Sequence, residues 1–104
     1  MTIKELEEYG KLTALYYEFS ESQLELTESE KKEFRSVKRK LFKISDFILS
    51  CKDPLIKQLM ILKFFRFMSW ESISKIVGGY NSADSCRMLI IRYINRENKN
   101  NNYR

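Results

Sequence analysis

The residues best suited to do chemistry lie in the last quarter of the chain, three or four positions apart. Read as a helix, this segment places Asp84, Arg87 and Met88 away from an apolar face, which consists of Cys86, Leu89, Ile90, Tyr93 and Ile94. An arginine can donate to O6 and N7 of guanine, a carboxylate can accept from N4 of cytosine, and a methionine can touch a thymine methyl group. The chemistry that this face suggests is the reading of base edges in the major groove of DNA.

Four more polar residues of the same segment suit contacts with phosphates. Arg92 and Arg96 lie farther from the start of the helix, whereas Ser82 and Ser85 lie at its start, where backbone N–H groups can bind a phosphate oxygen. Each arginine could equally be a solvated charge without a ligand. The elements that position the helix therefore decide between these interpretations.

The preceding residues predict a shorter helix and a tight turn. Ser69 can cap this helix, and Gly78 and Gly79 permit the positive φ that ends it. Asn81 or Ser82 can then cap the next helix. Two helices joined at a glycine turn, the second with arginines on an apolar frame, are typical of a helix-turn-helix that reads DNA.

The run from Leu62 to Ile94 resembles the helix-turn-helix of region 4 of bacterial sigma factors. The pairs Lys63-Phe64, Ser69-Trp70 and Ile73-Ser74 follow that family's order of a basic-aromatic pair, Ser/Thr-Trp-x-x-Ile-Ala and a capped recognition helix. Ser74 stands where the family usually has Ala, but it is still small, which keeps the two helices close. Nothing here resembles the sigma region that melts promoters and grips polymerase, so a complete sigma factor is not expected.

The stretch from Gly78 to Arg87 and the pair Arg92-Tyr93 resemble small phage and prophage proteins of about this length. In those proteins, Gly-Gly-x-Asn-Ser/Thr-x-Asp-Ser-Val/Cys-Arg opens the recognition helix and an Arg-aromatic pair ends it. The resemblance implies a sequence-specific DNA-binding protein of a phage or prophage-like element that regulates transcription. Double-stranded DNA is the expected partner, and RNA polymerase is a further candidate.

The chain as a whole is predicted to be all-α, in one compact unit. A helical hairpin over residues 1–52, which could serve as a dimerisation arm, precedes a three-helix module over residues 53–95 and a disordered tail over residues 96–104. In the module, Asp53-Pro54 starts a helix that extends to about Phe67. Its expected inward residues are Leu55, Leu59, Leu62 and either Phe64 or Phe65. Trp70 is expected to pack at the junction of the module's helices.

Two capping boxes predict the helices of the hairpin. Thr2-x-x-Glu5 opens the first, over residues 3–22, and Thr27-x-x-Glu30 opens the second. The second carries a heptad seam of Phe34, Val37, Leu41, Ile44, Ile48 and Cys51. The seam is too short for a free-standing coiled coil, so packing within the chain is favoured over the alternative, a homodimer seam. A dimer would read two half-sites about 10 to 10.5 base pairs apart, or a multiple of that spacing.

Charge is distributed unevenly along the chain. Residues 1–30 hold eight Glu against two Lys, a net charge of −6, whereas residues 31–104 hold 17 Lys or Arg against six acids, a net charge of +11. Counterion release draws such a basic segment to a phosphate polymer. A separate basic cluster consists of Lys31, Lys32, Arg35, Lys38, Arg39, Lys40 and Lys43. It could extend a phosphate track, meet an acidic partner or be an ordinary solvated face.

Other function classes have little support. Because the chain has no His and no Walker-type phosphate loop, we expect no enzyme, no catalytic residue and no cofactor. Cys51 and Cys86 fall on apolar faces and are predicted to be buried thiols, so no metal site is expected. The chain has no apolar run long enough to span a bilayer, and its first residues lack the pattern of a signal peptide. These features predict a cytoplasmic protein without a membrane partner.

Two alternative functions fit the same pattern. The protein could be an accessory of DNA packaging or recombination, similar to a terminase small subunit or a directionality factor, with the hairpin forming the oligomer. It could instead occupy the surface of RNA polymerase with a sigma-like fold, without reading DNA. The sequence does not separate these roles from transcriptional regulation.

Overall fold

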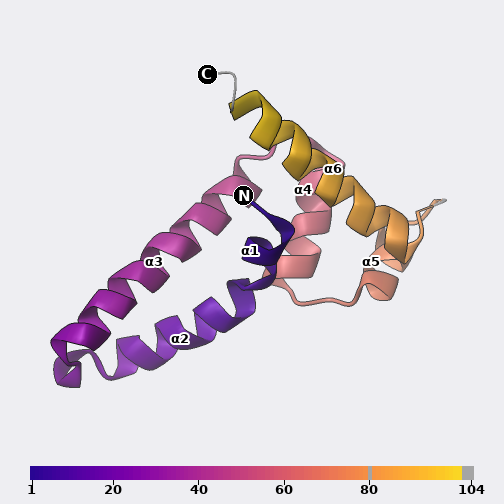
Figure 1. Cartoon of the computed structure of the whole chain (residues 1–104). Helices are drawn as coiled ribbons and strands as arrows, with labels where there is room; N and C mark the ends of the chain where they lie inside the picture. The colour runs from indigo at the N-terminus through magenta and orange to yellow at the C-terminus, as the bar shows by residue number, and fades with distance from the viewer. Residues whose placement is uncertain (80, 102–104) are drawn as a thin grey trace.

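The computed structural model describes residues 1–79 and 81–101 of the chain. Its elements are α1 (Ile3–Glu7), α2 (Tyr9–Glu21), a 3-10 turn η1 (Gln23–Glu25), α3 (Glu28–Leu49), α4 (Pro54–Met60), a π-helical turn η2 (Ile61–Phe65), α5 (Trp70–Val77) and α6 (Ala83–Asn101). No strand occurs within these ranges, which confirms the predicted all-α class. Helices α2 and α3 form one arm, and α4, α5 and α6 form the other (Figure 1). None of the described helices is long and apolar enough to cross a membrane.

The first arm is an antiparallel hairpin that buries the heptad seam within the chain. The predicted capping box starts α3: the Thr27 hydroxyl accepts from the Glu30 N–H at 3.2 Å, and Glu30 Oε1 accepts from the Thr27 N–H at 3.1 Å. The Phe34 ring lies 5.6 Å from the Phe19 ring and 5.7 Å from the Tyr16 ring of α2. Along the rest of the seam, Val37, Ile44, Ile48 and Cys51 are buried and Leu41 is half-buried. A homodimer would therefore need a different surface.

The first predicted helix is interrupted at Glu8, between α1 and α2. On one straight helix, Leu6 would lie about 120° around the axis from Leu12, because the two are six residues apart. Both side chains are nevertheless buried, and Leu6 is 0% exposed. The interruption lets α1 turn Leu6 into the core while α2 keeps Leu12 against the hairpin. The prediction of a single helix over residues 3–22 is thus wrong because two faces must be buried.

Only half of the first predicted capping box is present among the hydrogen bonds of the described residues. The Thr2 hydroxyl accepts from the Glu5 N–H at 3.1 Å, but the Glu5 carboxylate accepts from Lys43 Nζ on α3 at 3.2 Å. Although desolvation raises it, the pKa of Glu5 is lowered overall, because Lys43, the N-terminal amine and Thr2 all favour the ionised carboxylate. The contact of Glu5 with Lys43, 38 residues away, thus takes the place of the expected local contact with the Thr2 N–H.

The helix predicted to run from Asp53-Pro54 to Phe67 changes geometry partway. After α4, the Arg66 N–H donates to the Ile61 carbonyl at 3.1 Å, the i to i+5 spacing of a π-turn. Phe67 then has φ 57°, and the Met68 N–H donates to the Leu62 carbonyl, which closes the helix end. The turn η2 contacts both α2 and α5, so it joins the two arms.

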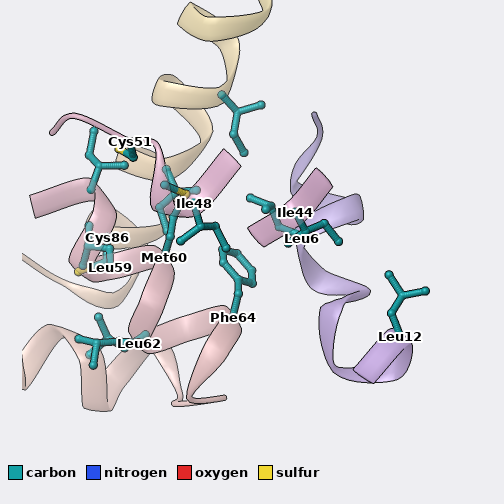
Figure 2. Packing of buried hydrophobic residues seen from close by; sticks show 14 of the residues in the cluster. Leu6, Leu12, Ile44, Ile48, Cys51, Leu59, Met60, Leu62, Phe64 and Cys86 are labelled. Carbon is teal, nitrogen blue, oxygen red and sulfur yellow. The ribbon is translucent and has the colours of Figure 1, made fainter. Parts of the chain in front are cut away.

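The register of α4 also differs from the prediction. Leu55 was expected inward but is 38% exposed, whereas its neighbour Ile56 is 4% exposed. Ile56 shares a face with Leu59 and Met60, which follow it by three and four positions and are fully buried. Leu62 and Phe64 are buried as predicted, and Phe65 is half-buried. Figure 2 shows Leu6, Ile44, Ile48, Met60 and Phe64 gathered where the two arms meet.

The last helix extends well beyond its predicted end. Helix α6 continues to Asn101, so the prediction of a disordered tail is wrong for residues 96–101, and residues 102–104 lie outside the described part. Asn98 holds this end of the helix against the start of the chain: its Nδ2 donates to the Met1 carbonyl at 2.8 Å, and its Oδ1 accepts from the Met1 amine at 3.3 Å. The sequence separation of 97 residues explains why no local pattern predicts the extension.

A pair of neighbouring substitutions tests the register of α4. We expect Ile56→Ala to lower the free energy of unfolding by about 2 to 5 kcal/mol, because it leaves a cavity in the core. Leu55→Ala should cost less than half as much, because Leu55 is partly solvated. Urea unfolding followed by circular dichroism measures both. A larger loss for Leu55→Ala would contradict the observed register.

Candidate nucleic-acid interface

Helix α5 begins at the cap predicted from the sequence. The Ser69 hydroxyl accepts from the Ser72 N–H at 3.1 Å, and Ile73 is fully buried one turn later. Lys63 fixes the approach to this cap: its Nζ donates to the Met68 carbonyl at 3.2 Å and lies 5.0 Å from the centre of the Trp70 ring. The basic residue of the Lys63-Phe64 pair thus positions α5 and is directed at the chain itself.

Trp70 is half-buried and packs against the core, in agreement with the packing role predicted for it. Its surroundings differ from the prediction, because it lines a small cavity of about 330 Å³ together with Leu6 of α1 and Gly10 of α2. The first arm approaches closely here: a Cβ on Gly10 would lie 3.0 Å from the Phe67 ring, so this exposed ring would have to shift. Trp70 therefore lies on the side of α5 that faces the hairpin.

The turn between α5 and α6 uses both glycines. Gly78 has φ 65° and ψ −161°, a conformation almost confined to glycine, and Gly79 has φ 68°. The Gly78 N–H still donates to the Ser74 carbonyl at 3.1 Å, which ends α5. Tyr80, which follows, lies outside the described residues.

Ser82, one of the two candidates, caps α6. Its hydroxyl accepts from the Ser85 N–H at 3.1 Å and lies 3.0 Å from the Ser85 hydroxyl. Of the backbone donors expected to meet a phosphate at this helix start, the Ser85 N–H is therefore already used within the chain. Both hydroxyls remain exposed at the helix start, where the helix dipole favours an anion.

One face of α6 packs on the core as the apolar pattern predicts. Cys86 and Ile90 are fully buried and Ile94 is 3% exposed, while Leu89 and Tyr93 are half-buried at the margin. Burial raises the pKa of the Cys86 thiol, which stays protonated at neutral pH. Cys51 is likewise buried and unbridged, as expected of two structural thiols.

The residues predicted to contact DNA are all exposed. They are Ser82, Asp84, Ser85, Arg87, Met88, Arg92 and Arg96. No carboxylate of the described residues lies within ion-pairing distance of the three arginines. Their charges are therefore available to a ligand.

The helix geometry separates the arginines more than the prediction implied. At about 100° per residue, Asp84 and Met88 lie close to one line along α6, Arg87 lies about 60° to one side of Asp84, and Arg92 lies about 80° to the other. Arg96 follows Arg92 one turn later, on the same side. The exposed face thus has a central row with an arginine on each edge.

Two exposed residues were missed by the sequence reasoning. Asn95 lies almost in line with Asp84 and Met88, but it was assigned to the end of the module because the tail was expected to be disordered. Lys75 lies in the last turn of α5, beside the glycine turn, where the first helix of a helix-turn-helix crosses the DNA backbone. Lys75 could have been chosen as a candidate from the sequence, since it is the only cation of α5.

No protein-family model, no curated protein and no solved structure matches the chain. The observations that bear on function are therefore the caps, the turn and the two faces of α6.

The turn conformation predicts a strong effect of a small substitution. We expect Gly78→Ala to lower the free energy of unfolding by about 1 to 3 kcal/mol, because the alanine must adopt a strained φ and ψ. Steric crowding is not the cause, since nothing lies within 4 Å of the added Cβ. Thermal melts measure the change. The control, Lys75→Ala on the exposed face of α5, should stay within about 0.5 kcal/mol, and an equal effect of both would refute the strain argument.

Proposed function

We propose that this chain is a sequence-specific DNA-binding protein of a phage or prophage-like element that regulates transcription. The single observation that carries the proposal is the pair α5 and α6, capped at Ser69 and Ser82 and joined at two glycines of positive φ. One face of α6 is buried in the core, and the opposite face is polar and basic. A recognition helix needs this division, because it must be held by the fold while its outer side chains enter the groove.

The roles of the side chains follow from their position along α6. Asp84, Arg87 and Met88 lie in its first two turns, which are the turns that contact base edges in helix-turn-helix proteins. Arg92 and Arg96 lie one and two turns farther along one edge, where phosphates run beside the groove. The Ser82 and Ser85 hydroxyls would approach a phosphate at the helix start. Lys75 would add a contact from α5.

The charge of the chain supports the same ligand. Residues 31–104 have a net charge of +11, from 17 Lys or Arg and six acids, and contain the whole helix-turn-helix. Such a surface gains affinity for DNA by releasing counterions. We place the protein in the cytoplasm, where its DNA target would be, and assign it no catalytic role. RNA polymerase and a second copy of the chain are proposed as further partners.

The first test of this proposal measures DNA affinity against salt. Binding to duplex DNA should weaken steeply as salt rises, with a log-log slope of about −0.9 for each phosphate contacted. Fluorescence anisotropy with a labelled duplex measures the slope. Absence of binding at low salt would contradict the proposal and would favour the alternative, a protein that occupies RNA polymerase.

The second test separates base reading from phosphate contact. We expect Arg87→Ala to relax sequence preference at one base pair, at a cost of roughly 1 to 3 kcal/mol for the preferred site. Arg92→Ala should weaken all sequences about equally and lower the magnitude of the salt slope by about one unit. Binding to a randomised site library measures both effects.

The control for this pair is Ile90→Ala, which acts on the buried face. It should destabilise the fold by roughly 2 to 5 kcal/mol, because Ile90 is fully buried. The two arginine variants should leave the thermal melt almost unchanged, since both side chains are exposed. If neither arginine variant alters affinity or sequence preference, α6 does not enter a groove.

A further inference from the structure

The outer face of α3 carries a row of cations that lies outside the helix-turn-helix. Residues 31–43 contain seven Lys or Arg and a single acid, Glu33, and all seven cations are exposed. Lys32, Arg35, Arg39 and Lys43 follow one another at three or four positions, which places them in one row about 16 Å long. The row lies on the side of α3 opposite the seam that packs within the chain.

The fold neutralises little of this charge. Among the described residues, two of the seven cations have a carboxylate partner: Lys31 pairs with Glu28 at 3.3 Å, and Lys43 pairs with Glu5 at 3.2 Å. Glu28 is largely exposed, and exposed pairs of this kind contribute little. The other five cations are exposed and have no carboxylate partner among the described residues. One of them, Lys38, places its Nζ 4.4 Å from the centre of the Phe34 ring.

The spacing of the cations also opposes helix formation. Lys31, Arg35, Arg39 and Lys43 are successive residues at the i, i+4 spacing, at which like charges destabilise a helix. A polyanion bound along the row would remove this repulsion. The isolated chain keeps an unfavourable arrangement that such a ligand would relieve.

A second copy of the chain offers fewer negative charges than the row needs, and they are widely spread. Five exposed glutamates precede α3 and are spread over residues 7–25, and two of them, Glu18 and Glu21, lie on α2. Duplex DNA, by contrast, carries one negative charge for about each 1.7 Å of its axis, or about ten along the length of the row. Charge complementarity therefore favours a phosphate polymer.

We propose that the outer face of α3 is a second phosphate-binding surface, which contacts duplex DNA independently of α6. Figure 1 shows α3 and α6 on different arms of the molecule, so the two helices would contact different stretches of phosphate backbone. The inference rests on the proposed function only in taking duplex DNA as the ligand. The residues that carry it are separate from those of α6.

The test neutralises three cations of the row that have no ion-pair partner among the described residues. The variant combines Lys32→Gln, Arg35→Gln and Arg39→Gln. A matched control combines Lys4→Gln, Lys11→Gln and Lys52→Gln, which removes the same charge from exposed positions outside α3 and α6. Affinity for a short duplex of random sequence is measured for both variants against salt concentration.

The expected result is a loss confined to the row variant. Its salt slope should become shallower by about 2.7 units, which is about 0.9 for each of three lost phosphate contacts, and the control should keep the slope of the natural chain. The row variant should also melt at the same temperature as the natural chain or a higher one, because repulsion is relieved. A lower melting temperature would mean that the row is structural and would overturn the proposal.

Two further outcomes would also overturn it. Equal salt slopes in the row variant and its control would refute the proposal that α3 binds phosphates. The proposal that α6 binds DNA would be unaffected. Loss of binding to a polyglutamate chain in the row variant, with duplex binding unchanged, would show that the row meets an acidic protein. If instead the row variant loses duplex binding while Arg87→Ala and Arg92→Ala change nothing, the α3 surface is supported and the α6 proposal fails.

Discussion

The burial of Leu6, Ile48 and Met60 in one apolar cluster is the constraint on which the rest of the structure depends. All three are fully buried, and they come from α1, α3 and α4, of which α1 is far from the other two in the sequence (Figure 2). They hold the hairpin to the arm that α4, α5 and α6 form. In a domain of 104 residues, one such cluster accounts for a large share of the apolar surface that folding can bury.

The need to bury apolar side chains of both arms in one cluster explains the irregular parts of the chain. The helix break at Glu8 brings Leu6 into the core, and the π-turn after α4 places Phe64 against the hairpin while Leu62 stays buried. Phe67 takes a positive φ immediately after this turn, where the chain leaves for α5. Each irregularity lies where one element must satisfy two neighbours, and the π-turn and Phe67 lie directly before the segment that leads to α5.

The apolar cluster where the two arms meet also restricts where charged side chains can lie. Because no charged side chain is buried among the described residues, the cations of α3 and α6 are confined to outer faces on the two arms. Among the described residues, the acidic segment 1–30 meets the cations of α3 in two ion pairs, Glu5 with Lys43 and Glu28 with Lys31. The described part of the fold therefore presents two basic surfaces, one on α3 and one on α6.

The sequence by itself determined the features that depend on neighbouring residues. The caps at Ser69 and Ser82, the capping box at Thr27, the glycine turn and the buried face of α6 were all predictable, because each involves groups within a few positions of one another. The exposure of the predicted DNA-contacting residues follows from the same periodicity. The tertiary structure alone decided the break at Glu8, the choice of Ile56 over Leu55, the inward turn of Lys63 and the extension of α6 to Asn101. Most of these depend on contacts between groups far apart in the sequence, such as Met1 with Asn98. A pattern of neighbouring residues carries no information on the energies of such contacts.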